Sequence, residues 1–126
     1  MASVLLVEDV PILRMILRGF LESGGHAVTE CDGGKEASRL IGDSRFDAIV
    51  TDIHMRDGDG LTFISNQRSN GVTIPIIAMT GGEPRSPQSQ SGNLALSAGA
   101  DRVLMKPVTK SEILGVIADT VTGSLA

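Results

Sequence analysis

The chain has 126 residues, of which 41% are hydrophobic and 21% charged, a composition typical of one soluble globular domain. The formal net charge is -4 and the basic residues are scattered singly, which argues against nucleic acid as a partner, because phosphate binding needs a clustered basic face. No apolar run approaches the roughly 20 residues that cross a bilayer, so no membrane contact is expected. The single cysteine, Cys31, excludes an internal disulfide and fits a reducing cytoplasm.

Five apolar segments alternate with segments whose apolar residues repeat at helical spacing. The alternation predicts an α/β fold, a doubly wound five-stranded parallel sheet with helices on both faces. The predicted strands cover residues 3–7, 27–31, 46–52, 74–79 and 102–105. The first predicted helix begins at Pro11 and stops at Gly24-Gly25, the second covers 35–41, the third follows Asp59 and ends at Asn70-Gly71, a short fourth covers 94–98, and the last follows Thr109 and reaches Val121. Residues 81–93 are rich in Gly, Pro, Ser and Gln and are predicted to form a loop.

Four of these strands end in a polar residue that can take part in chemistry. These polar residues are Glu8-Asp9 after the first strand, Asp52 at the end of the third, Thr80 after the fourth and Lys106 after the fifth. Because the carboxyl ends of parallel strands lie at one edge of the sheet, we expect these side chains to converge. Three carboxylates repel one another and favour a bound cation, and an all-oxygen ligand set favours Mg²⁺. A hydroxyl and an ammonium group beside them suit phosphoryl transfer, which needs positioning and charge neutralisation.

Each of these residues alone has a commoner explanation. A single Asp at a strand end is more often a turn former or a helix cap than a nucleophile. Asp9 can simply cap the first helix, and Asp57 and Asp59 fail the spacing of a calcium loop. The side chain of His54 has no His or Cys neighbours at metal-ligand spacing, so we expect that only its backbone matters. The arrangement is far more specific than its parts.

Four short motifs carry a resemblance to a known family. They are Val7-Glu8-Asp9, Asp52-Ile53-His54-Met55 with Asp59-Gly60-Leu61, Met79-Thr80-Gly81, and Ala98-Gly99-Ala100-Asp101 leading to Lys106-Pro107. With them the chain resembles the receiver domain of bacterial two-component response regulators, from about Ser3 to Val121. The resemblance implies a flavodoxin-like fold with strand order 2-1-3-4-5.

The resemblance also implies a role for each residue of the set. Asp52 would accept a phosphoryl group. Mg²⁺ would be bound directly by Asp9 and Asp52, through water by Glu8, and by the backbone carbonyl of His54. Thr80 would hydrogen-bond a phosphoryl oxygen and report its presence by moving. Lys106 would pair with the carboxylate or with its phosphoryl group, and the peptide bond before Pro107 would be cis.

The partners implied are a sensor histidine kinase or a histidine phosphotransfer protein, together with a downstream protein that the sequence does not name. The chain would catalyse only its own phosphorylation and dephosphorylation, so it is not expected to be an enzyme. We expect residues 1–126 to form a single receiver domain with no output domain. We favour a stand-alone cytoplasmic protein, a monomer or weak dimer, over a domain cut from a longer regulator.

Three features depart from the pattern of the family. Arg56 stands where a Pro is common. Val103 stands where the family usually carries the aromatic residue that swings inward when the Thr moves, so the usual switch aromatic is absent. The predicted loop over residues 81–93 is unusually long and polar. We hypothesise that this loop changes its order when Asp52 is phosphorylated.

Other functions remain open at this point. An aspartate-nucleophile phosphohydrolase of the haloacid-dehalogenase type uses a similar set of groups, but its nucleophile resembles Asp-x-Asp after the first strand, whereas His54 follows Asp52 here. A flavin carrier with the same fold is disfavoured because Glu8-Asp9 would repel phosphate. A receiver-like binding protein that is never phosphorylated is disfavoured by the complete acidic set.

Overall fold

The computed structural model describes residues 1–55, 58–81 and 88–123, with side chains for most of them. Five parallel strands form one sheet in the order β2-β1-β3-β6-β7. This is the predicted order 2-1-3-4-5 once the two short strands β4 and β5, which lie outside this sheet, are set aside. The sheet consists of β1 (Ser3–Val7), β2 (Ala27–Cys31), β3 (Ala48–Asp52), β6 (Ile76–Gly81) and β7 (Arg102–Lys106).

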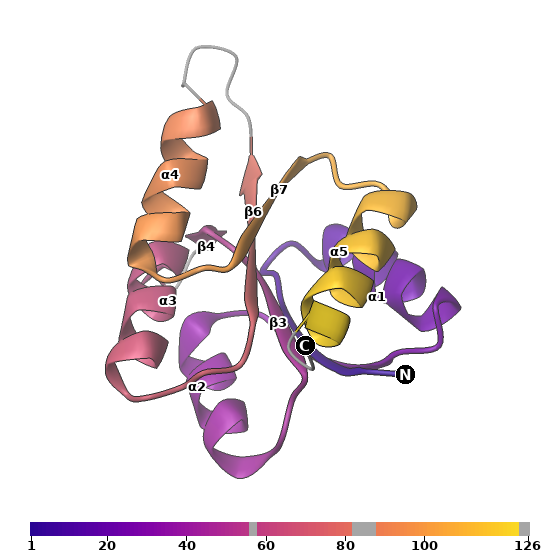
Figure 1. Cartoon of the computed structure of the whole chain (residues 1–126), viewed down its shortest axis with the longest axis horizontal. Helices are drawn as coiled ribbons and strands as arrows, with labels where there is room; N and C mark the ends of the chain where they lie inside the picture. The colour runs from indigo at the N-terminus through magenta and orange to yellow at the C-terminus, as the bar shows by residue number, and fades with distance from the viewer. Residues whose placement is uncertain (56–57, 82–87, 124–126) are drawn as a thin grey trace.

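Helices cover both faces of the sheet, as predicted. In Figure 1, α1 and α5 lie on one side and α2, α3 and α4 on the other. Their bounds are α1 (Pro11–Ser23), α2 (Gly34–Asp43), α3 (Gly60–Ser69), α4 (Gln88–Ala98) and α5 (Lys110–Gly123). The chain therefore has the doubly wound α/β fold that its alternating pattern predicts.

The two faces of the sheet carry separate hydrophobic cores because successive side chains of a strand point to opposite sides. Leu5 and Ile49 pack in the core under α2, α3 and α4. Leu6 and Val50, one residue further along, pack in the core under α1 and α5. All five residues of β3 are buried, so this central strand fixes Asp52 from both sides.

Helix ends follow local sequence signals. The hydroxyl of Thr109 accepts a hydrogen bond from the backbone N–H of Glu112 (3.1 Å), and the Glu112 carboxylate accepts one from the N–H of Thr109 (3.0 Å). This is the capping box that their spacing predicts. At the end of α1, Gly25 adopts a φ of 86°, which a residue with a side chain rarely does. On α1, Ile16 is 43% exposed, whereas Leu17 and Leu21 are buried.

Helix α4 is longer than predicted. The predicted loop over residues 81–93 is wrong in its second half, because α4 already begins at Gln88. Helix formation is cooperative, and Gln and Ser cost only a few tenths of a kcal/mol within a helix. Once buried Ala95 anchors the last turns, the preceding residues extend the helix. Residues 82–87 lie outside the described residues, and so does the part of the loop hypothesis that concerns them.

A second, two-stranded sheet was not predicted. Strand β4 (His54–Met55) pairs antiparallel with β5 (Gly58–Asp59), immediately after Asp52. The pair closes at its base, where the backbone N–H of Gly60 donates to the carbonyl of Ile53 (2.9 Å). Arg56 and the side chain of Asp59 lie outside the described part of the chain.

Arg68 connects the segments that precede β6 and β7, at the amino ends of these two strands. Its guanidinium donates to the backbone carbonyls of Gly99, Val72 and Ile74 at 2.8–2.9 Å. It also pairs with Asp101 (2.8 Å), whose carboxylate accepts the backbone N–H of Ile76. One side chain thus holds the end of α3 against the start of two strands, at the edge opposite Asp52.

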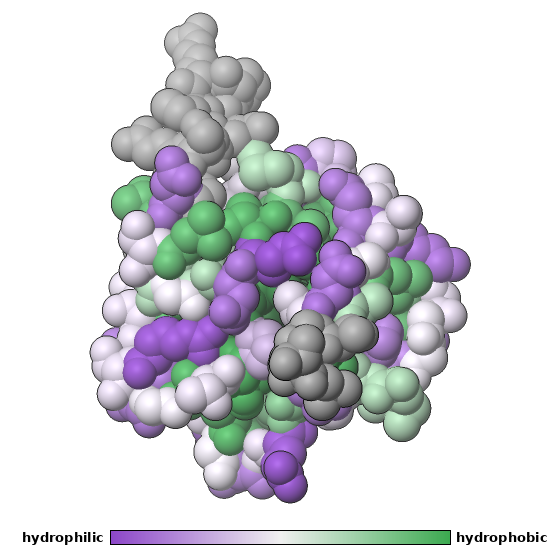
Figure 2. Space-filling view, viewed as in Figure 1, coloured by the Kyte–Doolittle hydropathy of each residue, from purple (hydrophilic) through white to green (hydrophobic). Residues whose placement is uncertain are grey.

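Hydrophobic and hydrophilic residues both reach the surface on the face drawn in Figure 2. Leu94 and Leu96 of α4 are about half exposed. Among the helices that the structure describes, none is both long enough and apolar enough to pass through a membrane. This agrees with the absence of long apolar runs in the sequence.

We predict that Gly60→Ala destabilises the protein by about 1–3 kcal/mol, the usual cost of overpacking a close contact. A Cβ atom at position 60 would overlap the backbone of Asp52 and Ile53. Backbone atoms at the end of a buried strand cannot move aside as a flexible side chain can. The free energy of unfolding, measured with urea, is the readout.

Gly115→Ala in α5 is the matched control. A Cβ atom there meets open space, so the higher helix propensity of alanine should stabilise the protein by about 0.5–1 kcal/mol. Equal effects of the two substitutions would contradict the proposed packing of Gly60 on the strand that carries Asp52.

Candidate functional site

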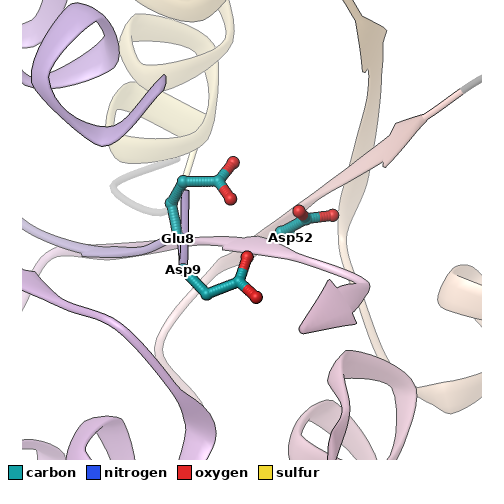
Figure 3. A group of neighbouring side chains, drawn as sticks. All are labelled: Glu8, Asp9 and Asp52. Atoms are coloured by element: carbon teal, nitrogen blue, oxygen red, sulfur yellow. The ribbon is translucent and has the colours of Figure 1, made fainter. Parts of the chain in front are cut away.

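Three carboxylates meet at the carboxyl edge of the sheet. Glu8 and Asp9 directly follow β1, and Asp52 ends β3, the neighbouring strand. One carboxylate oxygen from each residue lies within 4.8 Å of the others. Figure 3 shows the three side chains extending beyond the ends of the strands. The convergence expected from a parallel sheet therefore occurs for these residues.

Lys106, at the end of β7, lies between two of these carboxylates. Its ammonium nitrogen is 2.9 Å from Glu8 Oε1 and 2.7 Å from Asp52 Oδ2. Both distances are those of charge-assisted hydrogen bonds. When all three carboxylates are ionised, they exceed the one ammonium by two negative charges. A divalent cation would balance that excess.

Glu8 is the most deeply buried member of the set, with 0% of its surface exposed. Burial raises its pKa, because a charged carboxylate loses its hydration there, while the hydrogen bond from Lys106 acts against this shift. For Lys106, burial alone would lower the pKa, but the hydrogen bonds to Asp52 and Glu8 outweigh burial and raise it. The structure thus keeps a charged lysine beside a carboxylate that resists ionisation.

Thr80 is fully buried at the end of β6, next to the strand that carries Asp52. Its hydroxyl donates to the thioether sulfur of Met105 (3.1 Å), which stands opposite it in β7. Val103, which also lies in β7, is half-buried and packs in the core under α2, α3 and α4. Thr80 is therefore close to the acidic site along the sheet, while its hydroxyl points to Met105.

His54 contributes its backbone to the site. Its N–H donates to Asp52 Oδ1 (3.1 Å), while its side chain is exposed. This hydrogen bond holds the Asp52 carboxylate at the end of the strand. The Lys106–Pro107 peptide bond is cis, the isomer that the family resemblance implies. Whether the carbonyl of His54 binds a cation stays a prediction.

Two side chains at the site were not predicted from the sequence. Met105 is the hydrogen-bond acceptor of Thr80, and Arg14 of α1 donates to the backbone carbonyl of Glu8 (2.8 Å). The spacing of Arg14, one helical turn after Val10, was the available signal, because such a side chain reaches back over the start of its helix. Met105 could be identified only from the register of β6 and β7, which places it opposite Thr80. That register was not predicted from the sequence.

Cys31 does not take part in this chemistry. It is buried at the end of β2, and burial raises its pKa to about 11. A thiol with such a pKa is protonated at neutral pH and is a poor nucleophile. The Cys31 side chain instead packs in the hydrophobic core under α2, α3 and α4.

We predict that, without divalent cations, Glu8 makes the protein less stable as the pH rises above 4.5. Its pKa is 4.5 in an ordinary setting and higher in the folded chain. The native state therefore binds more protons than the unfolded state between those two pKa values, so the free energy of unfolding falls through that window. In Glu8→Gln this fall should disappear. Urea unfolding in EDTA between pH 4.5 and 8 measures it.

Glu112→Gln is the control with the opposite sign. The hydrogen bonds of the capping box lower the pKa of Glu112 below 4.5. The stabilisation that ionised Glu112 gives the folded protein is therefore present above pH 4.5 and is lost as the pH falls through the lowered pKa. A Glu8→Gln variant whose stability follows pH in parallel with the wild type would contradict the assignment of the fall to Glu8.

Comparison with known protein families agrees with this geometry. A family model described as "Response regulator receiver domain" matches residues 4–118. The transcriptional regulatory protein PhoP of Escherichia coli strain K12 is 34% identical over 111 residues, which are 88% of this chain and 48% of that protein. The chain therefore spans about half the length of this curated relative.

Solved structures give the same result. The receiver domain of a Francisella response regulator superposes with a TM-score of 0.89 at 24% identity, over 98% of this chain and 99% of that one, which shows the shared fold. The receiver domain of the sensor histidine kinase PA1611 from Pseudomonas aeruginosa PAO1 has a TM-score of 0.84 at 29% identity, over 96% and 98% of the two chains. That structure is described with a magnesium ion coordinated in its active site cleft.

Proposed function

Because the chain belongs to the response regulator receiver domain family of two-component signalling, we propose that Asp52 accepts a phosphoryl group. The donor is the phosphohistidine of a sensor histidine kinase or of a histidine phosphotransfer protein. The observation that supports this is the meeting of Asp52 with Glu8, Asp9 and Lys106 at one edge of the sheet. Buried strand β3 holds the acceptor in place.

In the transfer, a carboxylate oxygen of Asp52 forms a bond to phosphorus as the bond from phosphorus to the histidine nitrogen breaks. The histidine nitrogen keeps the bonding electrons. The Lys106 ammonium, already 2.7 Å from Asp52, pairs with the negative charge that arrives. Thr80 donates its hydroxyl to a phosphoryl oxygen, for which it gives up the sulfur of Met105. Positioning and charge compensation are the main demands of this chemistry.

The site is suited to Mg²⁺. Asp9 and Asp52 would bind the ion directly, Glu8 through water, and the backbone carbonyl of His54 would complete the protein ligands. The all-oxygen donor set and the excess of two negative charges support this assignment. When bound, Mg²⁺ neutralises charge on the phosphoryl oxygens.

The chain acts as a signalling domain that catalyses its own phosphorylation and dephosphorylation. The alternative, a phosphohydrolase with an aspartate nucleophile, would turn over many phosphate esters for each Asp52. We propose that residues 1–126 form one receiver domain that works in the cytoplasm as a monomer or weak dimer. The chain covers 48% of the PhoP relative. We propose that phosphorylation changes how it binds a downstream protein.

We predict that incubation with Mg²⁺ and phosphoramidate adds one phosphoryl group to the wild-type protein. Asp52→Asn should gain none, because its amide is not a nucleophile toward phosphorus, and EDTA should abolish the gain. Intact mass spectrometry measures the added mass, and base lability of the product distinguishes an acyl phosphate from a phosphoester.

Asp47→Asn is a matched control, because Asp47 precedes the same strand and bonds the backbone of Ser3 at the opposite edge of the sheet. It should be phosphorylated as the wild type is. Stoichiometric phosphorylation of the Asp52→Asn protein would contradict the proposal. Continuous release of phosphate with many turnovers would favour the phosphohydrolase.

A further inference from the structure

Arg14 links the acidic site to β2, the outermost strand on that side of the sheet. Its Nη1 donates to the backbone carbonyl of Glu8 (2.8 Å), and its Nε lies 3.5 Å from Glu30 Oε1. Glu30 belongs to β2, the strand next to β1. The Arg14 side chain is 23% exposed and that of Glu30 28%, so the bridge is largely sheltered from water.

The carbonyl that Arg14 holds belongs to the peptide group that joins Glu8 to Asp9. The same stretch is fixed on its other side, where the backbone N–H of Glu8 donates to the carbonyl of Cys31 (3.1 Å). With both contacts in place, the plane of the Glu8–Asp9 peptide has little freedom to rotate. Rotation of that peptide would swing the Asp9 carboxylate away from Glu8 and Asp52.

We infer that Arg14 is a positioning residue for the divalent cation: it fixes the Glu8–Asp9 peptide against β2 so that the two carboxylates stay aligned with Asp52. The inference rests on the proposed function in one respect, since it takes the acidic site to bind Mg²⁺. Arg14 itself would touch neither the ion nor the phosphoryl group. Groups that orient metal ligands in this way typically change metal affinity 10- to 100-fold when they are removed.

The sign of the effect separates this role from simple electrostatics. A guanidinium near an acidic site repels a cation, so its removal should tighten Mg²⁺ binding if charge alone mattered. If Arg14 positions the ligands, its removal should weaken Mg²⁺ binding instead. Without Arg14, Asp9 becomes ordered only when the ion binds, and this ordering makes the free energy of binding less favourable. The two explanations therefore predict changes in opposite directions.

Arg18 offers a matched control one helical turn along α1. In the part of the chain that the structure describes, its ion-pair partners are Glu22 and Glu30. It shares Glu30 with Arg14 and carries the same charge, but Arg14 is the one that reaches the Glu8 carbonyl. Arg18→Gln therefore removes a similar charge and an ion pair with Glu30. It leaves the hydrogen bond between Arg14 and the Glu8 carbonyl in place.

The experiment is a Mg²⁺ titration of the full chain by isothermal calorimetry. We expect Arg14→Gln to raise the dissociation constant for Mg²⁺ about 10-fold and Arg18→Gln to leave it within about 2-fold, since a lost surface ion pair has a small effect. Arg14→Lys keeps the charge and one donor and should recover part of the affinity. At saturating Mg²⁺, Arg14→Gln should reach the same extent of phosphorylation as the wild type.

An unchanged or lower dissociation constant in Arg14→Gln would overturn the inference, and so would an equal loss in Arg18→Gln. If urea unfolding shows that Arg14→Gln does not fold, Glu30→Gln is the deciding variant. It removes the Arg14–Glu30 contact and should also weaken Mg²⁺ binding. Unchanged Mg²⁺ binding in Glu30→Gln would overturn the inference. A wild type that binds no Mg²⁺ would instead refute the metal site of the proposed function.

Discussion

The placement of the Lys106 ammonium between Glu8 and Asp52 is the interaction on which the site depends. The fold buries both carboxylates almost completely, and buried charges of one sign are costly unless a partner compensates them. Lys106 can reach both because β7 lies beside β6, and β6 beside β3, in one continuous sheet. The chemistry at the edge is therefore inseparable from the packing of all five strands.

The sequence predicts the main architecture well because each predicted strand is a short apolar run and each helix has a separate signal. Strands β1 and β2 have the predicted bounds, and the capping box of Thr109 and Glu112 forms. The meeting of Glu8, Asp9, Asp52 and Lys106 could be anticipated for one reason. Parallel strands bring their carboxyl ends to the same edge, so residues far apart in sequence become neighbours there.

Features that depend on tertiary contacts could not be predicted in the same way. The Thr80–Met105 hydrogen bond requires the register of two strands, and the direct Glu8–Lys106 pair requires the path of a long side chain. Helix α4 extends over a polar stretch that propensity alone marks as a loop. Arg14 had only its spacing from Val10 as a signal, and its contact with Glu30 depends on where α1 lies relative to the end of β2.

The corner held by Arg68 has a consequence for genetics. It stabilises the amino ends of β6 and β7 through four partners, at the edge of the sheet farthest from the carboxylates. Loss of this side chain would leave several carbonyl groups without their donor and reduce the population of folded molecules. Every molecule that did fold would keep its acidic site intact. Substitutions at this corner are thus a natural source of heat-sensitive alleles, whose phenotype follows protein abundance and temperature.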